Sequence, residues 1–200
     1  LVIFLHGGLT SSPGGEHWLA STFHIPNEDP YILAIPSKFE WDWNPTKVLD
    51  VITDIKSNMR IDEDRIYLTG LSMGGRGTFI TAAAIPDMFA AIMPLSPHHQ
   101  PYSYISLAEK ISSIPIWMSH GDQDKISSYQ MAYHMKRELE KYGAEITFNT
   151  ITGGQHCCWH SIYEDPKVIE WLLSKTRETN KTIVKSNSWG SIKNDFMRAK

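Results

Sequence analysis

The chain alternates between short apolar runs and longer segments with helical spacing, and this alternation constrains its fold more than any other feature. The apolar, partly β-branched runs have the length of strands and lie at residues 1–5, 31–35, 65–69, 90–95, 115–119 and 146–151. Segments with helical spacing lie at 46–59, 72–85, 127–142 and 166–174. Because the runs are apolar throughout, both faces of each strand should be covered. The sequence therefore predicts an α/β fold, a mostly parallel sheet with helices on both faces.

The length and composition fit one domain. The chain has 200 residues, of which 42% are hydrophobic and 11% aromatic, which is enough for one well-buried core and too little for two ordinary domains. We expect this domain to cover residues 1–175. Residues 176–200 are polar and rich in Lys, Asn and Ser, so we expect a tail or a linker there.

Charge and hydropathy exclude two classes of partner. The formal net charge is -3 and the basic residues are scattered, so no nucleic-acid surface is expected. No apolar run approaches the roughly 20 residues of a membrane span.

Cys157 and Cys158 are adjacent, a spacing at which an intrachain disulfide is strained. The chain enters a strand pattern at Leu1, so we expect an upstream part to be missing. Location, cytoplasmic or secreted, and oligomeric state stay open.

A serine lies in a glycine motif between a predicted strand and a predicted helix. The motif Gly70-Leu71-Ser72-Met73-Gly74 fits the G-x-S-x-G pattern, which places a serine on a sharp turn with its hydroxyl clear of the sheet. The alternative is a phosphate-binding loop, but the lysine of that motif is missing. We therefore predict that Ser72 is a nucleophile.

Such a serine needs a histidine base and an acid that orients it, in the chain order serine, acid, histidine on loops after later strands. Asp124 follows the strand at 115–119, and His156 follows the strand at 146–151. We predict these two as acid and base. On loop position alone, Asp122 is the rival acid and His160 the rival base.

Two other polar clusters have alternative interpretations. A zinc site would use the candidate ligands His120, Asp122, Asp124, His156 and Cys157. Their spacing matches no standard zinc motif, so no metal is predicted. His98 and His99 follow the strand at 90–95, and we favour a polar loop near the pocket mouth over a ligand or substrate contact.

Acyl transfer also requires N–H donors for the negative charge on the carbonyl oxygen. The amide of Met73, after the nucleophile, should be one donor of this oxyanion hole. The second should come from the loop after the first strand, where His6-Gly7-Gly8-Leu9 lies. We predict Gly8 as the second donor, with Leu9 as the close alternative.

Side chains on the strand-end loops are candidates for substrate contact. We assign Leu9, Trp18, His98 and Trp159 to this role. The aromatic residues Trp18, Phe39, Trp41, Trp43 and Trp159 could either line a pocket or pack in the core. The segment 96–113 is too short for a large helical lid, so the site should be open.

Taken together, the motifs resemble the α/β-hydrolase superfamily over about residues 1–175. They are Leu5-His6-Gly7-Gly8, Gly70–Gly75, His120-Gly121-Asp122-Gln123-Asp124 and Gly154-Gln155-His156. The chain looks most like its compact esterases, the phospholipase/carboxylesterase, dienelactone-hydrolase and prolyl-oligopeptidase-like group. The resemblance implies that Asp124, the last Asp of His-Gly-x-x-Asp, is the acid. The N-terminal strand pair of that family is absent here, and His98-His99-Gln100 replaces its Gly-rich turn.

These observations predict a serine esterase that cleaves a small-molecule carboxylic ester through an acyl-enzyme intermediate without a cofactor. A serine peptidase of the prolyl-oligopeptidase-like type would use the same residues on an amide. A non-catalytic binding protein with the hydrolase fold is the alternative from another class. A dehalogenase would carry an aspartate where this chain has Ser72.

Overall fold

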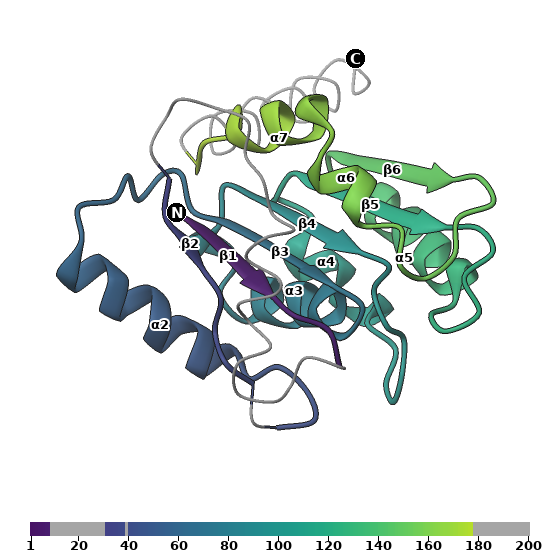
Figure 1. Cartoon of the computed structure of the whole chain (residues 1–200), viewed down its shortest axis with the longest axis horizontal. Coiled ribbons are helices and arrows are strands. Elements are labelled where there is room, and N and C mark those ends of the chain that lie inside the picture. The colour runs from purple at the N-terminus through teal and green to yellow at the C-terminus, as the bar shows by residue number, and fades with distance from the viewer. Residues whose placement is uncertain (9–30, 39, 178–200) are drawn as a thin grey trace, which may run out of the picture.

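The computed structural model describes residues 1–8, 31–38 and 40–177. Its centre is a six-stranded sheet in the order β2-β1-β3-β4-β5-β6 (Figure 1), and every neighbouring pair of strands is parallel. The strands are β1 Val2–Leu5, β2 Leu33–Ala34, β3 Tyr67–Leu71, β4 Ala91–Leu95, β5 Ile116–Gly121 and β6 Ile146–Ile151. The predicted α/β fold with a mostly parallel sheet is confirmed.

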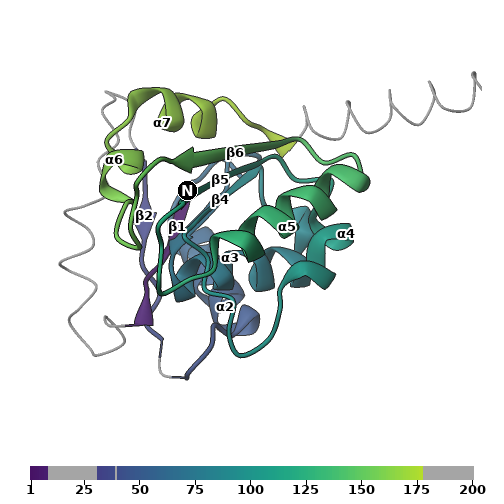
Figure 2. The same ribbon diagram turned by 90° about the vertical axis from the view of Figure 1, so that its right-hand side faces the viewer.

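Helices cover both faces of the sheet (Figure 2). One layer holds α2 Pro45–Asn58, α3 Met73–Ala84, α4 Ala108–Ile111 and α5 Tyr129–Lys141, and the other holds α6 His160–Tyr163 and α7 Pro166–Leu173. Short 3₁₀ turns lie at η2 Pro86–Met88 and η3 Ile105–Leu107. None of the described helices is long and apolar enough to cross a bilayer.

The two faces of the sheet have separate apolar cores, as alternation along a strand requires. In β1, Ile3 and Leu5 pack in the cluster under the larger layer, while Val2 and Phe4 pack in the cluster under α6 and α7. All four side chains are buried. A strand with partners on both faces needs apolar residues at every position, which explains the continuous runs in the sequence.

Side-chain caps and prolines define where several helices begin. The Asn44 side chain accepts from the Thr46 amide before α2, the Ser128 side chain accepts from the Met131 amide before α5, and the Asp165 side chain accepts from the Lys167 amide before α7. Pro45 and Pro166 occupy first-turn positions, where a missing N–H costs nothing. Because the caps determine where each helix begins, the observed starts of α2 and α5 differ by one or two residues from the predicted ones.

The C-terminal segment returns to the start of β3. The Tyr67 hydroxyl donates to the carbonyl oxygens of Leu173 at 3.2 Å and Lys175 at 3.0 Å. Arg177 Nη2 lies 3.0 Å from Asp64 Oδ1. The predicted tail from residue 178 onwards lies outside the described residues, so the domain boundary stays a prediction.

Candidate active site

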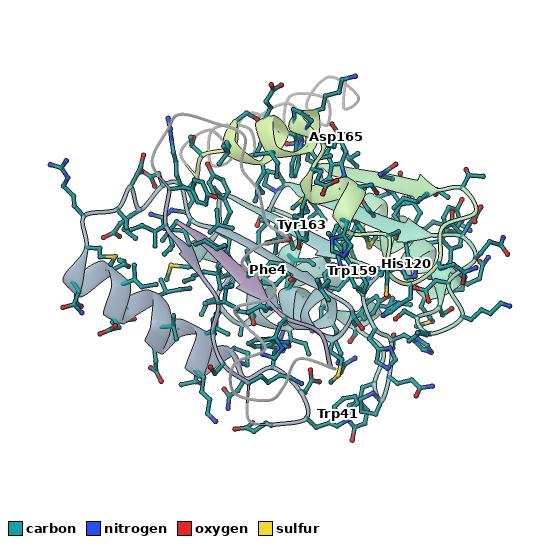
Figure 3. The ribbon with its side chains drawn as sticks, in the orientation of Figure 1. Phe4, Trp41, His120, Trp159, Tyr163 and Asp165 are labelled. Carbon is teal, nitrogen blue, oxygen red and sulfur yellow. The ribbon has the colours of Figure 1, made fainter. Side chains whose placement is uncertain are left out.

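The polar side chains of interest come together at one edge of the sheet. Because all strands are parallel, the loops after β1, β3, β4, β5 and β6 start from the same edge, where α/β proteins form their sites. His120 and Trp159 lie at this edge, near the ends of the central strands (Figure 3).

Ser72 is held in a strained turn between β3 and α3. Its φ of 56° and ψ of -114° are unfavourable for a residue with a side chain. The Ser72 amide donates to the Leu95 carbonyl at 2.9 Å, and the Ser72 carbonyl accepts from the His98 amide at 2.9 Å. A Cβ at Gly74 would lie 1.8 Å from the Leu5 carbonyl oxygen. The glycine pattern therefore reflects the close approach of β1 to the turn.

Ser72, His156 and Asp124 form a continuous chain of hydrogen bonds. His156 Nε2 lies 2.9 Å from Ser72 Oγ, and His156 Nδ1 lies 2.8 Å from Asp124 Oδ2. An ionised carboxylate only accepts hydrogen bonds, so Nδ1 carries the proton and Nε2 is free to accept from the serine hydroxyl. The three side chains have the geometry of a nucleophile, a base and an orienting acid.

The Asp124 carboxylate is buried and held on both oxygens. Its side chain is 0% exposed. Oδ1 accepts from the amides of Ile126 and Ser127, each at 2.8 Å. Burial alone would raise the pKa of Asp124, but the hydrogen bonds from His156 and these two amides outweigh burial and lower that pKa below its ordinary value. Asp124 is therefore an anion at neutral pH, as an orienting acid must be.

A second histidine contacts the same carboxylate oxygen. His120 Nε2 lies 3.1 Å from Asp124 Oδ2 and 3.2 Å from the Ser127 carbonyl oxygen, and the His120 side chain is buried. Burial lowers the pKa of His120. The sequence singled out His120 only as a possible zinc ligand and missed this contact. Within residues 1–8, 31–38 and 40–177, no group of three or more His, Cys, Asp or Glu side chains is arranged to hold a metal ion.

The rival acid and the rival base lie elsewhere. Asp122 Oδ1 accepts from the Gly153 amide at 2.8 Å, so this carboxylate joins the loop after β5 to the loop after β6. His160 is the first residue of α6, and its ring centroid lies 6.3 Å from that of Trp159. His156, and not His160, contacts both Ser72 and Asp124: its Nε2 accepts from the Ser72 hydroxyl and its Nδ1 donates to Asp124.

The loop after β1 lies against the serine turn. A Cβ at Gly7 would lie 3.5 Å from Ser72 Cβ, and a Cβ at Gly8 would lie 2.8 Å from Met73 Sδ. Met73 is the first residue of α3, where backbone N–H groups have no partner within the helix. Gly8 and Met73 are thus neighbours beside Ser72, as an oxyanion hole requires. Leu9, the alternative donor, lies outside the described residues.

Two of the four predicted substrate contacts, Trp159 and His98, lie within the described residues. Trp159 is 8% exposed and its ring meets that of His156 edge-on at 5.5 Å. The half-buried His98 has Nδ1 3.2 Å from Ser127 Oγ, and burial with nearby His99 and His156 lowers its pKa. Both therefore border the Ser72–His156 pair. Leu9 and Trp18 lie outside the described residues, as does Phe39.

The other two tryptophans among the pocket candidates, Trp41 and Trp43, differ in their exposure. Trp43 is buried and its ring centroid lies 5.0 Å from that of His6, so packing is its role. Trp41 is 55% exposed.

Arg76 joins three segments around the serine turn, a role that the sequence did not indicate. Its buried side chain extends from α3, and Nε donates to Asp42 Oδ2 at 2.8 Å on the segment before α2. Nη1 donates to the Tyr102 carbonyl on the loop after β4. Arg76 thus joins the segment before α2 and the loop after β4 to α3. These partners are far apart in the sequence, and only the fold brings them together.

Comparison with known proteins identifies the family. The family model for phospholipases and carboxylesterases matches residues 44–170, and the chain belongs to this family of α/β-hydrolase esterases. The chain is 32% identical over 142 residues to the bifunctional acetylxylan esterase/xylanase XynS20E of Neocallimastix patriciarum, an alignment that covers 65% of this chain and 20% of that protein. It is 28% identical over 106 residues to acyl-protein thioesterase 1 of Neurospora crassa, covering 48% and 41%.

A solved structure supports the fold. A thermostable esterase superposes with a TM-score of 0.67 and 24% identity, over 88% of this chain and 54% of that one. The chain spans a fifth of the length of the xylan esterase/xylanase and about two fifths of that of the thioesterase.

Proposed function

We propose that this chain is a serine esterase that cleaves a small-molecule carboxylic ester through an acyl-enzyme. One observation carries the proposal: the unbroken chain of hydrogen bonds from Ser72 Oγ through His156 to the buried Asp124, at 2.9 Å and 2.8 Å. We also propose residues 1–175 as the catalytic unit.

In the first half-reaction, Ser72 Oγ attacks the carbonyl carbon of the ester while its proton passes to His156 Nε2. The carbonyl oxygen becomes an oxyanion, which the amides of Gly8 and Met73 bind. Asp124 stabilises the positive charge on His156 without taking its proton. When the tetrahedral intermediate collapses, His156 Nε2 returns that proton to the alcohol oxygen, and the alcohol leaves the acyl-enzyme.

Water completes the reaction. It attacks the acyl carbon and gives a proton to His156 Nε2. The second tetrahedral intermediate collapses, the proton returns to Ser72 Oγ, and the carboxylic acid leaves. Every proton passes through His156, so no cofactor is needed. The Trp159 ring contacts that of His156 and the His98 amide donates to the Ser72 carbonyl, so the side chains of Trp159 and His98 are the proposed contacts for the acyl or alcohol group.

The relatives favour an oxygen or sulfur ester over an amide. The two curated relatives named above are described as an esterase and a thioesterase. We propose that this chain likewise transfers acyl groups from such esters, with acetylated polysaccharide and acyl thioester as the first natural substrates to test.

The test is hydrolysis of short-chain p-nitrophenyl esters, with labelling by a fluorophosphonate probe. Ser72→Ala and His156→Ala should each lower kcat by roughly 10⁴-fold or more, and Asp124→Asn by about 10⁴-fold, because these side chains act as one unit. Asp122→Asn is the matched control, since its carboxylate binds the Gly153 amide and not His156. A folded wild type that neither hydrolyses these esters nor takes up the probe would overturn the proposal in favour of a binding protein.

A further inference from the structure

Asp124 Oδ2 has two imidazole neighbours and not one. His156 Nδ1 lies 2.8 Å from this oxygen, and His120 Nε2 lies 3.1 Å from it. The other carboxylate oxygen accepts two backbone amides. Four donors therefore surround one carboxylate, and the two on Oδ2 compete for its electron density.

The surroundings of His120 fix its protonation. Nε2 faces two acceptors, Asp124 Oδ2 and the Ser127 carbonyl oxygen, so Nε2 carries the hydrogen. Nδ1 is buried and has no hydrogen-bond partner among the described residues. A second proton on Nδ1 would be a buried, unsatisfied donor on a charged ring, which is unfavourable. The geometry therefore favours His120 as a neutral donor with its hydrogen on Nε2.

We propose that His120 is a positioning residue of this site: its Nε2–H fixes Asp124 Oδ2 and weakens the pull of that oxygen on the Nδ1 proton of His156. The inference rests on the proposed function of the triad. A carboxylate that shares its charge between two donors stabilises the His156 imidazolium less than one that serves a single donor. His120 thus favours the neutral form of His156, which is the form that accepts the Ser72 proton.

Other titratable and charged groups also lie near Asp124 and its two histidines, His120 and His156. They are His98 from the loop after β4, which interacts with His156 and Asp124 and has His99 and Arg76 as further neighbours, Cys158 from the loop after β6, which interacts with Asp124, and Tyr129 from α5, whose ring lies edge-on to His120 at 6.0 Å. All of these groups are common to all the variants below. They shift every pH profile equally and leave the difference between variants intact.

The experiment compares His120→Phe, which fills the site without a donor, with His120→Gln, whose side-chain amide nitrogen can reach the same oxygen. The acid limb of kcat/KM on a p-nitrophenyl ester should move up by roughly half to one pH unit in the Phe variant, the size expected for one lost hydrogen bond. It should return toward wild type in the Gln variant. His134→Phe makes the same change on an exposed face of α5 and should leave the limb in place.

An NMR measurement distinguishes the hydrogen-bonding role of His120 from a role in packing alone. In proton NMR, the low-field resonance of His156 Nδ1–H should move further downfield in the Phe variant, because the remaining hydrogen bond to Asp124 strengthens. In the wild type, ¹⁵N-labelled His120 should report the Nε2–H tautomer at neutral pH. This wild-type measurement holds even when the Phe variant does not fold.

The outcomes distinguish the two proposals. An active Ser72→Ala variant overturns the proposed function. An inactive Ser72→Ala variant, together with equal acid limbs in wild type, Phe and Gln variants, overturns only the role of His120. Observation of the Nδ1–H tautomer of His120 in the wild type would also overturn the role of His120 and leave the proposed function intact.

Discussion

At the scale of single residues, the glycines in and beside the serine turn have two distinct tasks. Gly74 is packed against the β1 backbone, where a Cβ would lie 1.8 Å from the Leu5 carbonyl oxygen. Gly8 faces the far end of a flexible side chain, because its Cβ would meet Met73 Sδ at 2.8 Å. Backbone cannot yield as a methionine can, so the first glycine serves the fold and the second serves the site.

This difference predicts opposite effects of two similar substitutions. Gly74→Ala should lower the free energy of unfolding by roughly 3 kcal/mol or more, because β1 must move away from the turn. Gly8→Ala should leave the protein folded while lowering kcat, because the proposed oxyanion donor is displaced. Urea unfolding followed by fluorescence measures the first effect, and p-nitrophenyl ester kinetics the second. Equal stabilities of the two variants would contradict this assignment.

The sequence indicates Ser72, Asp124 and His156 as the proposed nucleophile, acid and base because each follows a strand in the required chain order. The elbow pattern of Ser72 is local, and parallel strands bring Asp124 and His156 to the same edge. The contact of His120 with Asp124 could not be predicted, since His120 lies at the end of β5 and Asp124 in the loop after it, and a spacing of four residues across a strand end does not determine where two side chains point. Arg76 was missed for a related reason: its partners Asp42 and Tyr102 are far from it in the sequence.

At the scale of elements, the long helices and strands were predictable and the short ones were not. α2, α3, α5 and α7 have enough residues to display a helical period, whereas α4, α6, η2 and η3 have three or four each. β2 was predicted over residues 31–35 and pairs only over Leu33–Ala34. Pairing depends on the neighbouring strand, which the local sequence of β2 does not contain.

The capping of α7 gives a prediction at this scale. Asp165→Ala removes the side chain that accepts from the Lys167 amide at 3.0 Å, and should lower the free energy of unfolding by about 1 kcal/mol. Asp165→Ser, which keeps a capping oxygen, should retain most of the stability. Chemical denaturation of both variants tests this. An alanine variant as stable as wild type would show that the first turn of α7 has no need of its cap.

At the scale of the whole molecule, buried ionisable groups determine how stability depends on pH. The pKa of His120 is lowered from 6.5 mainly by burial, and that of Asp124 is lowered from 3.8 by its hydrogen bonds, against burial. Both groups bind protons more readily in the unfolded chain. Each therefore contributes stability that is complete above its unfolded pKa and is lost as pH falls through its folded pKa.

We therefore expect stability to decrease on acidification in two stages, the first starting below about pH 6.5 from His120 and the second below about pH 4 from Asp124. His120→Gln removes the first titrating group and should flatten the first stage, while His98 contributes to it in both proteins. Urea midpoints measured from pH 8 to pH 3 provide the test. Parallel curves for the two proteins between pH 6.5 and pH 4.5 would contradict it.

The position of β6 at the end of the described sheet has a consequence for how the molecule gains and loses reactivity. Ser72, the proposed nucleophile, follows β3 near the middle of the sheet, and His156, the proposed base, follows β6, which pairs only with β5 in the strand order. A strand held from one side opens locally at lower free energy than the centre does. Opening of β6 would part His156 from Ser72 while both apolar cores persist. We therefore expect the native ensemble to include a folded but unreactive state, so that on heating the activity is lost at a lower temperature than the fold.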